Sequence, residues 1–87
     1  MITIKYPKDP DATLDYGFDW SPWLEEGETV ATSEWILSDG LTKESDQKTS
    51  TNTRVWITGG EDGRSYQATN RITTSMGRTD DRTLLIR

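Results

Sequence analysis

The side chains of this 87-residue chain that could take part in chemistry include fifteen Asp and Glu carboxylates but no histidine. Two carboxylates can act as acid and base on a glycoside. With so many acidic residues some pair lies close by chance, and no motif singles one out. Without histidine, the serines and threonines lack their usual activating base. The sequence therefore predicts that the protein is not an enzyme and has no catalytic residue.

An acidic run near the N-terminus is the stretch whose spacing comes closest to a cation site. Asp9, Asp11 and Asp15 could offer oxygen ligands to calcium, but the glycine and the bidentate glutamate of an EF-hand loop are missing. The chain has neither cysteine nor histidine, so it cannot form a disulfide or the usual zinc sites. We expect solvated acids here, with no metal and no other cofactor.

Tryptophan gives the clearest functional signal, because four occur in so small a chain. Trp20 and Trp35 lie on the apolar faces of predicted strands, which favours the core. Trp23 comes just after a strand, and Trp56 points away from the apolar face of its own strand. Because tryptophan is enriched in interface hot spots, Trp23 and Trp56 are predicted to contact a partner. The alternative is that loops fold over the rings and the Trp56 strand is buried on both faces.

Composition and charge narrow the class of protein. The net charge of −5 argues against nucleic acid, whose phosphates require a basic surface. Only 31% of the residues are hydrophobic, so the aromatic rings must supply much of the core. No signal peptide begins the chain, and no run approaches the roughly 20 apolar residues of a membrane span. We expect a protein made in a bacterial cytoplasm, without a membrane partner.

The first ten residues are predicted to form an N-terminal arm or edge strand, separate from a single domain over 11–87. Ile2, Ile4 and Tyr6 alternate onto one side, and two prolines then end the segment. A free arm suits a protein that assembles with others, so these three residues join the predicted partner interface. A solvated tail is the alternative.

Alternation with a period of two runs through most of the chain, as half-buried strands require. Two inward rows are predicted to be long: Ala31, Ser33, Trp35 and Leu37, and then Tyr66, Ala68, Asn70, Ile72 and Thr74. The polar stretch 43–52 is predicted to be an exposed loop or an edge strand. The predicted strands are 14–20, 29–37, 53–57, 66–74 and 82–86, and the last two form a hairpin that turns at Gly77.

Turns recur every ~8–12 residues, which is typical of an all-β sandwich or small barrel. Trp35 would lie at the centre of the core, and Tyr66 begins the penultimate strand. We therefore predict a compact immunoglobulin-like β-sandwich of about six or seven short antiparallel strands.

The segment from Gly59 to Ile86 resembles the final hairpin of bacterial and phage immunoglobulin-like domains, and Tyr66, Gly77 and Leu84 carry the likeness, together with Ile72. More widely, the chain resembles small proteins encoded in the structural operons of tailed phages and prophages. Their pattern appears here as KDPDATLDYGFDWSPWL, TVATSEWIL, GLT, VWITGG and GRTDDRTLLI. The resemblance implies a structural protein located in the virion and brings no catalytic residues with it.

Two roles follow from this resemblance, and the tryptophans suggest a third. The first is a capsid decoration protein that stabilises the head by binding the major capsid protein or other virion proteins as a dimer or trimer. The second is a structural protein of the head–tail junction or tail. The third is a carbohydrate- or receptor-binding module in which Trp23 and Trp56 stack on sugar rings.

Overall fold

The protein is a stack of two β-sheets. The computed structural model describes residues 5–6 as backbone, together with 13–61 and 64–86, and contains no helix among them. The strands are β1 (Lys5–Tyr6), β2 (Leu14–Asp19), β3 (Val30–Leu37), β4 (Leu41–Lys48), β5 (Asn52–Gly59), β6 (Tyr66–Thr74) and β7 (Thr79–Ile86).

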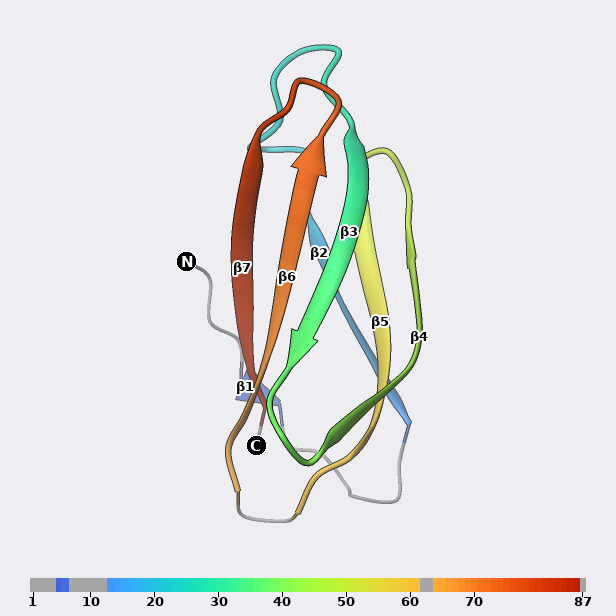
Figure 1. Cartoon of the computed structure of the whole chain (residues 1–87), viewed down its shortest axis with the longest axis vertical. Helices are drawn as coiled ribbons and strands as arrows, with labels where there is room; N and C mark the ends of the chain where they lie inside the picture. Colours follow the sequence, from blue (N-terminus) through green and yellow to red (C-terminus); the bar gives the residue numbers. More distant parts are fainter. Residues whose placement is uncertain (1–4, 7–12, 62–63, 87) are drawn as a thin grey trace.

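One sheet has the order β1-β7-β6-β3 and the other the order β2-β5-β4, and Figure 1 looks down on the first. The pairs are antiparallel except for β1 with β7, which is parallel and departs from the predicted all-antiparallel arrangement. The predicted all-β sandwich is confirmed. Its immunoglobulin-like character stays a prediction, which the strand order supports. The Tyr66 hydroxyl also supports it, because it accepts a hydrogen bond of 2.7 Å from Glu61 N, as in a tyrosine corner.

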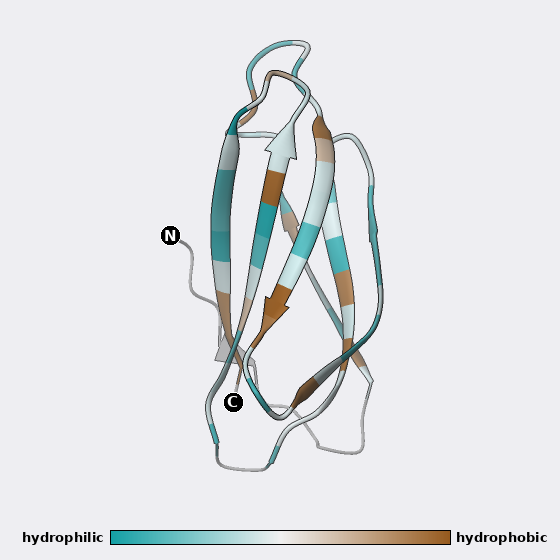
Figure 2. Cartoon of the chain, in the orientation of Figure 1, coloured by the Kyte–Doolittle hydropathy of each residue, from teal (hydrophilic) through white to brown (hydrophobic). Residues whose placement is uncertain are grey.

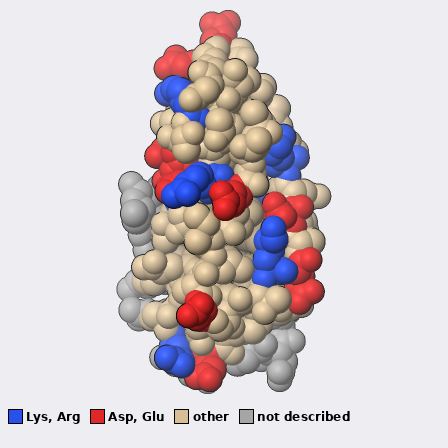
Figure 3. Space-filling model, viewed as in Figure 1, with Lys and Arg blue, Asp and Glu red and all other residues tan. Residues whose placement is uncertain are grey.

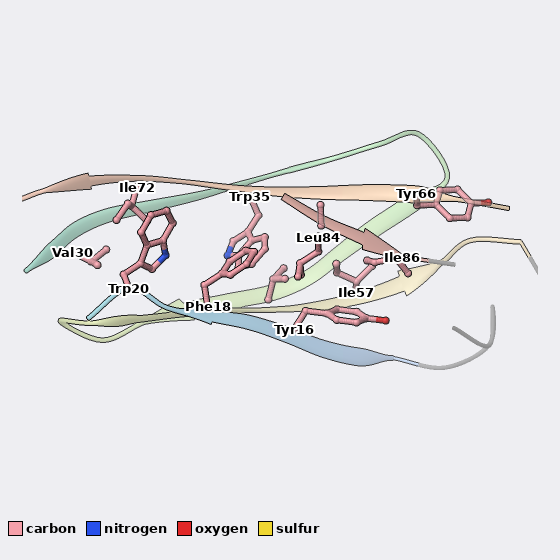
Figure 4. Packing of buried hydrophobic residues seen from close by; sticks show 12 residues of the cluster. Tyr16, Phe18, Trp20, Val30, Trp35, Ile57, Tyr66, Ile72, Leu84 and Ile86 are labelled. Atoms are coloured by element: carbon pink, nitrogen blue, oxygen red, sulfur yellow. The ribbon is translucent and has the colours of Figure 1, made fainter. Parts of the chain in front are cut away.

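The core consists of the inward rows of both sheets, and large aromatic rings fill its middle (Figure 4). Phe18 stacks on Trp35 with ring centroids 6.0 Å apart, and Trp20 is fully buried beside them. The predictions that Trp20 and Trp35 lie in the core are confirmed. In β6 all five predicted inward residues are buried, although Figure 2 shows the strand to be mostly hydrophilic or neutral with few apolar bands.

A buried asparagine joins the two sheets through the core. Asn70 is fully buried in β6, and its Oδ1 accepts hydrogen bonds from Trp20 Nε1 at 3.0 Å and Thr53 Oγ1 at 2.6 Å. Its Nδ2 donates to Ser33 Oγ at 2.9 Å and to Glu34 O at 3.1 Å. Every polar atom of the side chain is therefore satisfied, which is what makes a polar group tolerable at this depth.

The predicted inward row of β3 is wrong at its start. The pairing with β6 shifts register between Val30 and Thr32, so that Val30 is buried and Ala31 is exposed. A bulge inserts one residue into a strand and reverses the faces on one side of it. Alternation counted backwards from Trp35 therefore places Ala31 on the wrong face.

The polar stretch after β3 is an edge strand rather than a loop. β4 pairs only with β5, and its residues are exposed apart from the half-buried Leu41. Its register shifts between Lys43 and Ser45, which makes a second bulge. Charges and bulges at an edge discourage pairing with other sheets. The edge-strand alternative for 43–52 is confirmed over most of its length.

Candidate partner-binding surfaces

Trp56 lies on the outer face of the β2-β5-β4 sheet, on the side away from the core. Its cross-strand neighbours are Asp15 on β2 and Ser45 on β4, and its ring is half-buried. Two positions before it on the same face, Arg54 donates a hydrogen bond of 2.8 Å to the Asp15 carboxylate. We call this surface the Trp56 face, and its members are Asp15, Gly17, Asp19, Ser45, Gln47, Asn52, Arg54 and Trp56.

A shallow groove of about 760 Å³ crosses the Trp56 face where Gly17 leaves out a side chain. A Cβ atom at Gly17 would lie 2.5 Å from Thr53 O, so the close approach of β2 to β5 excludes any larger residue. The backbone therefore requires glycine here, and the groove is a consequence. Its rim carries polar and charged groups, among them Asp15, Asp19 and Arg54.

Trp23 does not form a common surface with Trp56. It is half-buried and packs its ring edge against Trp20, with centroids 5.5 Å apart. The guanidinium of Arg78 covers its ring, 4.1 Å from the centroid. Trp23 thus has partners within the chain, as expected if loops fold over the ring, and its contact with another protein stays a prediction. Two tryptophans placed this way do not form one platform for a sugar.

The loop that carries Trp23 is held by a buried carboxylate. Glu28 is 4% exposed, and its carboxylate accepts hydrogen bonds from both Arg78 Nε and Arg78 Nη2. Thr74 Oγ1 donates to the same carboxylate at 2.5 Å. The hydrogen bonds from Arg78, followed by that from Thr74, lower the pKa of Glu28 to about 2 although burial acts in the opposite direction. This contact fastens loop 20–29 to the β6–β7 turn, at the top of Figure 1.

A second arginine, Arg82 on β7, contacts residues at the end of β2. Arg82 lies over the Trp20 ring, 4.0 Å from the centroid, and donates a hydrogen bond of 3.1 Å to Asp19 O. Such cation–π contacts gain strength as the ring is shielded from water. Arg82 therefore connects the end of β2 to the opposite sheet.

The outer face of the other sheet has a different chemistry. Two cross-strand threonine pairs join β6 to β7, Thr69 with Thr83 at 3.0 Å and Thr73 with Thr79 at 3.2 Å. We call this surface the threonine face; it also includes Ile36, which is 42% exposed, and Arg71 with Asp81. Figure 3 shows charged groups crossing the middle of this side of the molecule, with broad uncharged areas around them.

Arg71 and Asp81 form a bidentate ion pair on the threonine face. The two hydrogen bonds measure 2.9 and 3.0 Å, and they lower the pKa of the Asp81 carboxyl and raise that of Arg71. Sequence reasoning did not single out this face as a contact surface. The available signal was the outward row of the predicted hairpin, in which threonines recur on both strands.

Of the predicted N-terminal arm, the structure describes only the backbone of residues 5–6. Ile2 and Ile4 lie outside the described residues, and Tyr6 is described through its backbone, which pairs with Ile86. The backbone at Lys5 and Tyr6 forms the short edge strand β1. A contact between this arm and a partner stays a prediction.

No cluster of three acidic, cysteine or histidine residues suited to a metal occurs among 13–61 and 64–86. Asp9 and Asp11 fall outside the described residues, and Asp15 is paired with Arg54. In the described part of the chain, no helix is long and apolar enough to cross a membrane.

Comparison with known proteins identifies the family. Residues 8–87 match the family described as podophage GP4 fiber-tail adaptor protein gp77. The chain belongs to this family, which makes it a structural protein of a phage virion, in agreement with the predicted class and location. No curated protein matches the chain.

Proposed function

We propose that this chain joins a fibre to the tail of a podophage virion. The family description names an adaptor of this kind, and an adaptor is a structural component rather than a class of enzyme. This favours the head–tail and tail-associated alternative over capsid decoration, for which the family description offers no support. The partners are then other virion proteins, the fibre among them.

The observation that carries this proposal is the pair of chemically different faces on opposite sides of one thin sandwich. An adaptor must bind two unlike proteins at once. The Trp56 face offers a tryptophan and an arginine, which are residue types enriched in interface hot spots, and a groove that Arg54 helps to line. The threonine face offers a flatter surface of small polar side chains around one ion pair. Two proteins can contact these surfaces without competing.

The fold also suits a part that must hold its shape under load. The Cα positions extend over 42 × 22 × 17 Å, and Asn70 ties the two sheets together across the core. At one end, Glu28 and Arg78 hold the connecting loop against the β6–β7 turn. A small domain without disulfides gains further stability when it docks onto partners. Association as a dimer or trimer stays part of this proposal, because most oligomers are symmetric assemblies of few copies.

The test is to grow the phage with an early stop codon in the gene for this chain, alongside a control in which the chain is supplied from a plasmid. The proposal predicts particles with filled heads and complete tails but without fibres, which adsorb poorly to cells. Plasmid expression should restore the fibres. Particles that carry the normal number of fibres would overturn the proposal. Particles with unstable heads would instead support the role of a capsid decoration protein.

A further inference from the structure

β2 is an edge strand of the sandwich, and it has no neighbour on its outer side within the described residues. The sheet order β2-β5-β4 leaves nothing beyond β2. An immunoglobulin-like sandwich has its first strand at this place. Here the first described strand, β1, pairs instead with β7 in the other sheet. No described strand therefore occupies the position beside β2, and the outer edge of β2 is open there.

The direction of the free backbone groups on β2 follows from the ladder. Trp20 N donates to Thr51 O at 2.8 Å, which marks the pair of residues 20 and 51 as hydrogen-bonded. Antiparallel ladders alternate, and the β2–β5 register is regular, so the main-chain groups of Asp15, Gly17 and Asp19 point to the open edge. Arg82 takes Asp19 O from that side, which agrees with this direction.

The two long strands at the opposite side of the sandwich contain bulges, which discourage added strands, whereas β2 contains none. Both β3 and β4 contain a register shift, and β4 is exposed and charged along most of its length. β2 is a regular strand of six residues, and its central Gly17 has no side chain to obstruct another backbone.

We propose that the open edge of β2 binds an extended segment of another virion protein, which adds a strand to the β2-β5-β4 sheet. This inference rests on the proposed adaptor function and assigns one of its two contacts to a main-chain interaction. Strand addition draws affinity from main-chain hydrogen bonds and specificity from alternate side chains.

Charge favours a foreign segment over a second copy of this chain. If two copies paired their β2 strands about Gly17, Asp15 of each would face Asp19 of the other on the same side of the sheet. Like charges directly opposite each other are destabilising. The matching partner instead carries Lys or Arg two residues before and two residues after the residue that faces Gly17. Its intervening residues face inward, on the same side of the sheet as Tyr16 and Phe18.

Hydrogen–deuterium exchange of the free chain and of the chain within purified virions tests this directly. In the free chain, the amides of Asp15, Gly17 and Asp19 should exchange quickly, while those of Tyr16 and Phe18 exchange slowly. In the virion, the peptide that spans β2 should become protected. Protection elsewhere with β2 unchanged would overturn the inference but leave the adaptor function standing. Absence of the chain from the virion would overturn the adaptor function itself.

The same experiment separates the other possible occupants of the edge. Fast exchange at these three amides in the dilute free chain is required by the proposal. Protection in the dilute free chain would mean that a segment of this chain already covers the edge, and the inference would fail. Protection that appears only as the free chain is concentrated would assign the edge to a second copy, which also contradicts it.

Two proline variants form a matched pair for the same question. In Asp15→Pro, the lost amide faces the open edge, so the β2–β5 ladder keeps its bonds and a partner strand is blocked. Asp46→Pro does the same on β4, where alternation from the Thr49–Asn52 pair also directs the amide outward. Each variant removes one exposed ion pair.

Mass spectrometry measures the number of copies of the chain per virion. This number should fall about tenfold for Asp15→Pro, because an affinity loss of tenfold corresponds to a few lost hydrogen bonds. For Asp46→Pro it should stay within about twofold of the wild type. Equal incorporation of the two variants would overturn the inference. Thermal melting of both purified variants establishes that they fold.

Discussion

The indole nitrogen of Trp20 donates a 3.0 Å hydrogen bond to Oδ1 of Asn70, and this bond links the end of β2 in one sheet to the middle of β6 in the other. Thr53 Oγ1 shares the same acceptor from β5. A core of this size has few apolar side chains with which to fix how its sheets pack. A satisfied polar contact at its centre supplies that specificity, since any other packing would leave buried donors unpaired.

Replacing Asn70 by alanine should lower the free energy of unfolding by about 3 kcal/mol, because buried Thr53 Oγ1 would lose its acceptor and Trp20 Nε1 would keep only its longer hydrogen bond of 3.3 Å to Thr53 Oγ1. Urea unfolding followed by tryptophan fluorescence measures the loss. Asn52→Ala is the control, since Asn52 is exposed and should cost under about 1 kcal/mol. If the two substitutions lowered the free energy of unfolding equally, the buried hydrogen bonds of Asn70 would not contribute to stability as argued.

Stability should depend on pH through Glu28. Its pKa is about 2 in the folded protein against an ordinary value of 4.5, so the carboxylate stabilises the fold above pH 4.5. That contribution is lost as the pH falls from 4.5 toward 2, because the unfolded chain takes up the proton first. Glu28→Gln should therefore melt lower than the wild type near pH 6, and the two melting temperatures should converge near pH 2.

Asp19 and Asp81 also have lowered pKa values. The wild type and Glu28→Gln both retain these two residues, so the difference between their melting temperatures isolates the effect of Glu28. Arg78→Lys provides a further comparison, because lysine keeps the charge but cannot donate two hydrogen bonds in a fixed fork. If the melting temperatures of the wild type and Glu28→Gln differed by the same amount at every pH, the pH dependence would not come from Glu28.

Gly17→Ala should destabilise the fold by about 2 kcal/mol, because the new methyl group would meet the main-chain oxygen of Thr53 rather than a flexible side chain. Asp15→Ala on the same strand and the same face is the control, and it removes only an exposed ion pair worth about 1 kcal/mol or less. Chemical unfolding of both variants measures the difference. A stability for Gly17→Ala equal to that of the wild type would mean that the groove does not arise from backbone crowding.

Trp56→Ala should leave the fold intact and weaken binding to the virion partner by about 2 kcal/mol or more, as expected for a tryptophan at a contact surface. Incorporation into virions by a complementing plasmid measures binding, and thermal melting measures the fold. Met76→Ala is the control, since Met76 is 55% exposed in the β6–β7 turn, away from the Trp56 face. Normal incorporation of Trp56→Ala would remove this residue from the interface.

Strand identity was predictable wherever one face is buried along the full length of a regular strand. The alternation in β2, β5 and β6 gave the correct inward rows, and Gly77 has the positive φ of 79° that the predicted turn requires. The row in β3 failed because the bulge after Val30 depends on pairing with β6, which no local pattern reveals.

The candidate site was only partly predictable, because its decisive contacts join residues far apart in the chain. Trp56 could be placed on an outer face from alternation alone. The inward role of Trp23 depends on Arg78, and the burial of Glu28 depends on Thr74 and the same arginine. In the sequence, Glu28 is simply the last acid of a turn. The open edge of β2 likewise follows from sheet order, which alternation within single strands does not determine.

Electron cryo-microscopy of the virion tail is the measurement that tests the adaptor function most directly. The sandwich described here should fit density between the tail and the base of a fibre, with one outer surface or edge in contact with each. A strand from a neighbouring protein should continue the β2-β5-β4 sheet beyond β2. Density for this chain distributed over the head shell, or in contact with a single partner, would contradict the account.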